Sequence, residues 1–292
     1  MDKREIVFHV GLGKCGSTFL QKNYFPKIEG WEYQSTHQYI DKRLRFIFEL
    51  NRQFDQVGSN ADFLRFSAPF CSGKIVKKWS DEVNAFLKRS NENILISSEG
   101  LCGVGYNPLR NNLDICFLLK DLFPGKIKII FFFRKQSDYC EAQYKQLVYR
   151  ENRFRKHLSF NEVWSERCTS RSLATIGELN WLRIVENYQN CFGQENVLAL
   201  PHEMMKENLS SFKEKLDNFL GIRVAVSPNF YDVKENKTPD SVKYKRIFSK
   251  GNDTMFSKLD EGLKYQIDSY HVADNMRLSK AIGVNLHNYG YY

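Results

Sequence analysis

The sequence predicts an α/β protein with three layers (α/β/α), in which helices cover both faces of a central, mostly parallel sheet. Short apolar runs rich in β-branched and aromatic residues alternate with segments of helical period along much of the chain. This alternation is typical of consecutive βαβ units. The chain has no internal repeat, no low-complexity tract and no linker rich in Pro, Gly or Ser, so we expect residues 1–292 to form a single domain.

The first predicted unit is a strand, a glycine-rich loop and a helix. Residues 4–10 form an apolar, β-prone run that stops at Gly11, and residues 17–27 have helical spacing. Residues 31–75 show no clear period, so we expect irregular structure and short helices there.

The alternation continues through the rest of the chain. Further strands are predicted at residues 93–98, 126–133 and 196–200, of which 126–133 is the strongest. A helix capped by Ser80 is predicted from that residue to Arg89. The other predicted helices cover residues 109–123, 137–149, 177–191 and 208–220, and a helical segment follows about residue 257.

Composition limits the class of protein. Of the 292 residues 42% are hydrophobic, which is enough to fill a sizeable core, and the formal net charge is +9. The positive charge is compatible with anionic partners, but it does not indicate which class of anionic partner binds. The densest basic cluster, residues 150–157, is typical of a solvated loop, and we expect no nucleic-acid partner.

The cysteines and the apolar runs indicate the cellular compartment in which we expect the protein. The seven cysteines are widely spaced and form no C-x-x-C pair, which predicts neither a disulfide framework nor a metal site. Residues 1–6 have no apolar signal-peptide core, and no apolar run reaches the ~18 residues of a membrane span. We therefore expect a cytoplasmic protein without a membrane span.

The loop after the first strand has the features of a phosphate cradle. It reads Gly11-Leu12-Gly13-Lys14-Cys15-Gly16-Ser17-Thr18. Glycines let the backbone approach a ligand closely, Lys14 adds a positive charge, and Ser17 and Thr18 place hydroxyl donors in the first helical turn. N–H groups at the start of a helix also favour a bound anion. The loop predicts phosphate binding, and the alternative is a tight turn with an ordinary cap.

Residues 11–16 also satisfy G-x-G-x-x-G, the dinucleotide fingerprint, so a nicotinamide-dependent oxidoreductase is an alternative. That fold requires an acidic residue about 20 positions further on, at the end of a second strand. Glu32 lies at that distance, but no convincing strand precedes it. The Walker A order is absent because Lys14 precedes Gly16, which argues against an ordinary ATPase or GTPase.

In outline, strand, G-x-x-K-[ST]-G-[ST]-[ST], helix, the loop resembles the phosphosulfate loop of the sulfotransferase family. The resemblance implies a P-loop-like fold, the donor 3′-phosphoadenosine 5′-phosphosulfate (PAPS) and no metal. It also implies that Lys14 is catalytic, in contact with the leaving phosphosulfate, and that Cys15 stands where Ser or Thr is usual. The implied donor-binding residues of the loop are Gly13, Lys14, Cys15, Gly16, Ser17 and Thr18.

A second similarity to the family is the strand that ends in Arg134. In the family such an arginine, with a serine eight residues later, binds the 3′-phosphate of the nucleotide. Here the position eight residues on is Ala142. The resemblance implies that Arg134 binds the 3′-phosphate. The alternative is that Arg134 forms an ion pair with a purely structural role. The candidates to replace the serine are Ser137, Gln143 and Lys145.

Glu99 follows the predicted strand at residues 93–98, at the sheet edge where ligands of open α/β folds bind. Sulfuryl transfer requires in-line placement, stabilisation of the leaving group and removal of the acceptor proton. A carboxylate base contributes about 10² to 10⁴ in rate. Related bacterial and glycan sulfotransferases carry a similar strand-end glutamate as the base, so we predict this role for Glu99. A capping or ion-paired glutamate is the alternative.

Two further segments resemble the family. Glu235-Asn236-Lys237-Thr238 is similar to a segment from which a basic residue folds over the nucleotide, so Lys237 is an implied ligand. Residues 279–292 resemble the tail of bacterial sulfotransferase domains. The resemblance implies a sulfotransferase acting on a hydroxyl acceptor, with a glycan as the expected class. A nucleotide- or glycan-binding protein without turnover is the remaining alternative.

Overall fold

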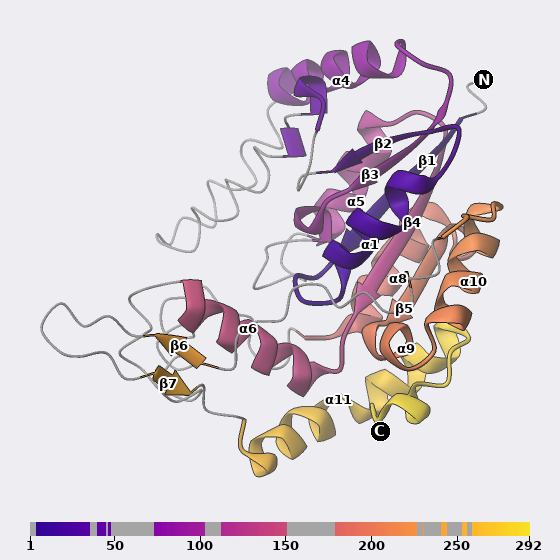
Figure 1. Ribbon diagram of the computed structural model, residues 1–292. Coiled ribbons are helices and arrows are strands. Elements are labelled where there is room, and N and C mark those ends of the chain that lie inside the picture. Colours follow the sequence, from indigo (N-terminus) through magenta and orange to yellow (C-terminus); the bar gives the residue numbers. More distant parts are fainter. Residues whose placement is uncertain are drawn as a thin grey trace, which may run out of the picture.

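A computed structural model gives the fold of the protein (Figure 1). It describes residues 4–35, 40–44, 46–47, 73–102, 112–150, 179–226, 230, 241–243, 253–255 and 259–292.

The centre of the fold is a five-stranded sheet with the strand order β2-β3-β1-β4-β5. All neighbouring strands in it are parallel, so the predicted α/β class with a parallel sheet is confirmed. The strands are β1 (Glu5–Gly11), β2 (Trp31–Ser35), β3 (Asn93–Ser97), β4 (Lys126–Phe133) and β5 (Val197–Pro201). Four of them lie where the sequence predicts strands.

Strand β2 corrects the expectation of irregular structure over residues 31–75. Trp31–Ser35 pairs with β3 and, among the described strands, forms one edge of the sheet. As an edge strand it is only partly covered: Trp31, Glu32 and Tyr33 are half-buried, whereas the interior strand β1 is almost completely buried. The mixture of polar and aromatic residues in β2 did not predict a strand, because only strands buried on both faces are continuous apolar runs in the sequence.

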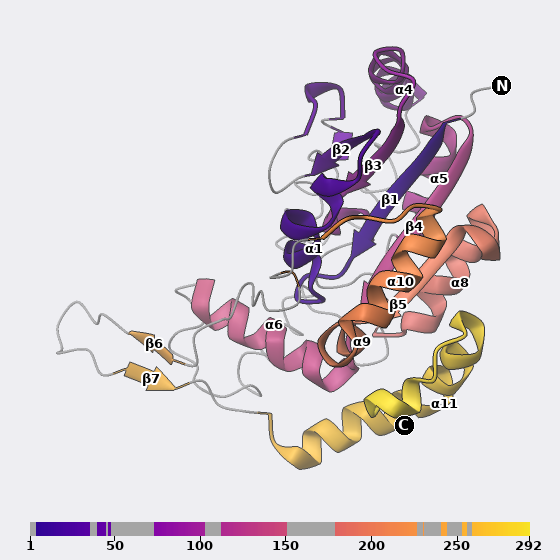
Figure 2. The ribbon, with the colours of Figure 1, turned by 45° about the vertical axis from the view of Figure 1, so that its right-hand side comes forward.

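Helices cover both faces of the sheet (Figures 1 and 2). On one face, α1 and α10 lie together, because the Tyr24 hydroxyl, just after α1, donates to Asp217 of α10 at 2.6 Å. The helices are α1 (Ser17–Asn23), α4 (Gly73–Leu87), α5 (Asn112–Leu122), α6 (Gln136–Arg150), α8 (Trp181–Phe192), α9 (His202–Glu207), α10 (Leu209–Leu220) and α11 (Glu261–Ile282).

The side chains of β4 show how the two layers of helices are held. Phe132 packs against Phe212 of α10, with ring centroids 5.1 Å apart. Phe131, on the opposite face, packs against Tyr188 of α8 at 6.4 Å. Successive side chains of a strand point to opposite faces. The buried aromatic residues of β4 therefore pack against the helices on both faces of the sheet.

The ends of several helices differ from the expected ones. Ser80 lies inside α4 and is no cap, because the apolar positions Val76, Trp79 and Val83 continue one helical face back to Gly73. In α10 the Asn208 side chain caps the first turn by accepting from Ser211 N–H at 3.0 Å. The segment after that helix adds a short antiparallel pair, β6 (Ser241–Lys243) and β7 (Asp253–Met255).

Helices α6 and α11 lie beyond the carboxyl ends of the strands in both views (Figures 1 and 2). Within the described part of the chain, no helix combines the length and apolar character needed to cross a bilayer. The same part holds no cluster of three or more His, Cys, Asp or Glu side chains suited to a metal ion.

Candidate active site

The loop between β1 and α1 has a backbone shape that few residues adopt. Lys14 has φ 73° and Gly16 has φ 88°, both in the left-handed region. A Cβ atom at Gly16 would lie 2.3 Å from Met205 Cε and 3.0 Å from His202 Nδ1. Glycine is therefore required here both by the backbone angle and by the close approach of α9. Lys14 is the one described non-glycine residue with positive φ, and such strain is typical of functional sites.

The first turn of α1 carries a buried hydroxyl. Ser17 is 1% exposed, and its Oγ atom has no hydrogen-bond partner among the described residues. The Oγ atom faces the end of β1, because a Cβ at Gly11 would lie 3.1 Å from it. A buried polar group without a partner is costly, so this hydroxyl is suited to a ligand. The next hydroxyl, that of Thr18, is half-buried.

Cys15, between the two left-handed residues, offers its backbone and not its side chain. It is 1% exposed, and its N–H donates to the Leu12 carbonyl at 3.3 Å, which closes a tight turn. Burial raises the pKa of the Cys15 thiol well above its ordinary value. The thiol therefore stays protonated at neutral pH and contributes no negative charge to the loop.

The structure brings Glu99 to the loop, as the sequence predicts for the sheet edge. Ser98 N–H donates to the His9 carbonyl at 3.0 Å, which holds the end of β3 against β1. A Cβ at Gly13 would lie 3.5 Å from Glu99 Oε2 and 3.6 Å from Gln143 Nε2. The Glu99 carboxylate is thus within reach of a group bound at the loop.

Arg134 links the end of β4 to the same loop. Its Nη1 atom donates to the Lys14 carbonyl at 3.5 Å, while its Nε atom is buried without a partner among the described residues. Its own carbonyl accepts from Trp181 Nε1 at 2.8 Å. The guanidinium therefore faces the β1–α1 loop and keeps one buried donor that a ligand can satisfy.

Helix α9 adds charge next to Arg134 that the sequence did not indicate. Burial, and then the positive charge of Arg134, lower the pKa of Lys206. Burial also lowers the pKa of His202 to about 3, helped by the charges of Arg134 and Lys206, so His202 is neutral at physiological pH. Positive charges that act on one another favour a bound anion nearby. A lysine on a short polar helix gives no signal in the sequence alone.

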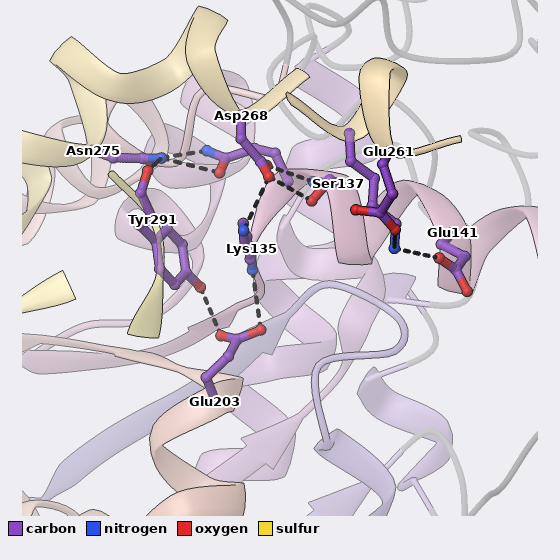
Figure 3. Close-up of polar contacts among 10 residues, drawn as sticks. Lys135, Ser137, Glu141, Glu203, Glu261, Asp268, Asn275 and Tyr291 are labelled. Carbon is purple, nitrogen blue, oxygen red and sulfur yellow. Dashed lines mark hydrogen bonds and ion pairs between the residues drawn. The ribbon is translucent and has the colours of Figure 1, made fainter. Parts of the chain in front are cut away.

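The three residues considered as replacements for the serine missing at Ala142 all have partners of their own. The Ser137 hydroxyl donates to Asp268 Oδ2 at 2.8 Å (Figure 3). Gln143 Nε2 donates to the Gly13 carbonyl at 3.4 Å, and Lys145 pairs with Glu141 at 2.7 Å. Ser137 remains a predicted ligand, but a phosphate would have to displace Asp268 from it. Lys237 lies outside the described residues.

The order of the strands tests the alternative that the protein is a nicotinamide-dependent oxidoreductase. Glu32 does lie in a strand, β2, but β3 separates that strand from β1. In the dinucleotide-binding fold the second strand lies beside the first. The presence of β2 therefore does not favour a nicotinamide cofactor, because β3 separates the Glu32 carboxylate from the loop.

Comparisons with known proteins agree with this geometry. No family model matches the chain. A curated human protein, Sulfotransferase 4A1, is 26% identical over 114 residues, which cover 39% of this chain and 38% of that protein. The chain thus matches less than two fifths of the length of this relative.

Among solved structures, a sulfotransferase from Alicyclobacillus acidocaldarius is similar with a TM-score of 0.59 and 16% identity, covering 98% of both chains. Mouse sulfotransferase SULT7A1 complexed with PAP gives a TM-score of 0.42 at 18% identity, over 80% of this chain and 65% of that one. The predicted resemblance to sulfotransferases is confirmed, and the chain has the fold of the Alicyclobacillus protein.

Proposed function

From a chain with the sulfotransferase fold, we propose an enzyme that transfers a sulfuryl group from PAPS to a hydroxyl of an acceptor. One observation carries the proposal. The strained β1–α1 loop, the Glu99 carboxylate and the Arg134 guanidinium meet at the carboxyl edge of the parallel sheet, where open α/β folds bind their ligands.

The loop would hold the phosphosulfate end of the donor. Ser17 and Thr18 would donate their hydroxyls to the 5′-phosphate, and the backbone of residues 13–16 would surround it. The buried Ser17 Oγ atom without a partner supports this fit. Lys14 would stabilise the negative charge that grows on the phosphate as it leaves, the kind of electrostatic contribution that dominates many enzymes.

Arg134 would bind the 3′-phosphate at the other end of the nucleotide. Its buried Nε atom without a partner and the neighbouring positive charge of Lys206 support an anion there. Lys206 would supply a cation in place of the absent serine at Ala142. Ser137 and Lys237 are further proposed donor ligands.

Glu99 would act as the general base. As the acceptor oxygen attacks sulfur, its proton passes to the Glu99 carboxylate, and the bond between sulfur and the phosphate oxygen breaks. The closeness of Glu99 Oε2 to Gly13 supports this role, because the base must lie beside the sulfuryl group that the loop holds. No step in this scheme is assigned to a metal.

The proposed acceptor is a carbohydrate, on the resemblance of the chain's tail and strand-end glutamate to glycan-modifying members of the family. The proposed location is the cytoplasm. The described cysteines are free thiols, which supports a reducing compartment. A binding protein without turnover is the second candidate, favoured by the alanine at position 142.

Thermal unfolding with nucleotides tests the proposal. A ligand that binds only the folded state at 100 times its Kd stabilises it by about 2.7 kcal/mol. We expect adenosine 3′,5′-bisphosphate, and not NADH, to stabilise the protein. Lys14→Ala should reduce this stabilisation, while Lys27→Ala, an exposed lysine beyond α1, should not. Stabilisation by NADH alone would overturn the proposal, and nucleotide binding without transfer to any hydroxyl acceptor would favour the binding protein.

A further inference from the structure

The peptide bond that follows Arg134 is held from both sides. Its carbonyl oxygen, that of Arg134, accepts from Trp181 Nε1 at 2.8 Å. Its N–H, that of Lys135, donates to Glu203 Oε1 at 3.2 Å. Since both polar atoms of this peptide have partners in other elements, the peptide cannot rotate without breaking a partly buried hydrogen bond. The direction in which the Arg134 side chain leaves the backbone is therefore fixed by Trp181 and Glu203.

Glu203, at the start of α9, is a buried carboxylate that depends on its donors. It is 7% exposed, and its second oxygen accepts from the Tyr291 hydroxyl at 2.8 Å (Figure 3). Burial raises the pKa of Glu203, while Tyr291, the Lys135 N–H and the charge of Arg134 act against the rise. Without the tyrosine hydroxyl, one oxygen of a buried acid would lose its partner.

Tyr291 is itself held in place by the helices beyond the sheet. It is fully buried, its ring meets that of Phe133 edge-on with centroids 5.8 Å apart, and its carbonyl accepts from Asn275 Nδ2 at 3.2 Å. Asn275 of α11 and Gln136 of α6 exchange two amide hydrogen bonds, at 3.0 and 3.1 Å (Figure 3). The position of the tyrosine hydroxyl is thus set by packing and by the backbone.

These contacts form one connected path from Tyr291 through Glu203 to the peptide after Arg134. We propose that Glu203 and Tyr291 are positioning residues of the donor site, which orient the Arg134 guanidinium toward the 3′-phosphate of the nucleotide. Neither side chain touches the nucleotide in this assignment. The inference rests on the proposed function, because it takes Arg134 as a ligand of that phosphate.

The test compares two tyrosines and two nucleotides. Tyr291→Phe removes the hydroxyl that holds Glu203. Tyr292→Phe is the matched control, since the Tyr292 hydroxyl donates to Ser279 Oγ, at 3.1 Å, and not to Glu203. The affinities of adenosine 3′,5′-bisphosphate and adenosine 5′-monophosphate are measured for each protein by calorimetry. The two ligands differ only in the 3′-phosphate.

We expect Tyr291→Phe to weaken the binding of the bisphosphate about 2- to 30-fold, the range for residues that act through a neighbour, and to leave the affinity of the monophosphate unchanged. Tyr292→Phe should change neither affinity. Glu203→Ala, which removes the partner of both the Lys135 N–H and the Tyr291 hydroxyl, should reproduce the selective loss. Because the readout is a ratio of two affinities within one protein, a lower folded fraction cannot imitate it.

An unchanged ratio in Tyr291→Phe, whether both affinities stay or both fall together, would overturn the positioning role. The proposed function fails in a different way. If the wild-type protein bound both nucleotides equally, Arg134 would not be a 3′-phosphate ligand, and the donor assignment itself would be wrong.

Discussion

Two turns at the same edge of the sheet are built in opposite ways. The loop after β1 has its own characteristic backbone shape, with left-handed Lys14 and Gly16 and a tight turn between Leu12 and Cys15, to which Arg134 and Gln143 add hydrogen bonds from outside. The turn after β4 is shaped from outside: Lys135 N–H binds a carboxylate 68 residues away, and Ser137 binds another at a separation of 131 residues.

The difference separates two tasks. A loop that depends on a few adjacent residues can be rigid and close to a ligand at once, which suits it to the reacting group. A turn held by distant carboxylates depends on the packing of the whole domain, which suits it to the end of a nucleotide far from the chemistry. The β1 loop should therefore dominate the rate, and the β4 turn should affect affinity and stability.

Glu99→Gln should have the largest effect, because Glu99 faces the β1 loop as the proposed base. We expect the rate of sulfuryl transfer, measured from labelled PAPS over a panel of hydroxyl acceptors, to fall about 10²- to 10⁴-fold. Glu92→Gln, an exposed residue just before the other end of β3, is the control and should transfer normally. Wild-type rates in Glu99→Gln would remove Glu99 from the mechanism.

Gly16→Ala tests whether the β1 loop depends on its own backbone. Left-handed strain costs roughly 1–2 kcal/mol, and displacing the Met205 methyl adds about 1–3 kcal/mol, both measured as a loss in the free energy of unfolding. Gly221→Ala carries the strain alone, since its φ is 69° and a Cβ there would meet nothing within 4 Å. Equal losses in the two variants would show that α9 does not press on the loop.

Asp268→Asn should have the smallest effect and tests the β4 turn. Asp268 pairs with Lys135 Nζ at 3.1 Å and accepts from both Ser137 N–H and Ser137 Oγ (Figure 3). We expect loss of this charge to lower the free energy of unfolding by about 1 kcal/mol, measured by denaturant titration.

Asp260→Asn on the same helix is the control, because asparagine caps a helix as well as aspartate does. An unchanged stability in Asp268→Asn would mean that the β4 turn holds its own shape, and the contrast between the two turns would disappear.

The same contrast explains what the sequence could predict. The β1 loop was recognisable because the residues of its motif are adjacent in the sequence, and β4 because the seven consecutive residues 127–133 alternate between two buried faces. The carboxylates of Glu203 and Asp268 gave no signal, since their partners are set by tertiary contact. Lys206 was missed for the same reason.

Strand β2 and the start of α4 show a different limit. β2 is a short edge strand whose side chains are partly polar, so its pattern is weak against an irregular background. The first turns of α4 are rich in lysine, so their apolar face is weak in the sequence. Ser80, which lies in the middle of the helix, was therefore predicted to be its N-cap. The strand β2 was not predicted and α4 was predicted to begin too late for the same reason. Both elements are partly exposed, and the patterns used to predict them are those of buried elements.

The central place of β1 has a consequence for how the chain reaches this structure. Ile6 pairs with Ile94 on one side and with Ile127 on the other, so both partners of the first strand are made much later. At the usual 5–20 residues per second, translation takes roughly 6 to 24 s to reach the second partner. During that time an apolar strand with two unpaired edges is open to wrong pairing, and residues 5–11 would be a target for chaperones that bind nascent chains.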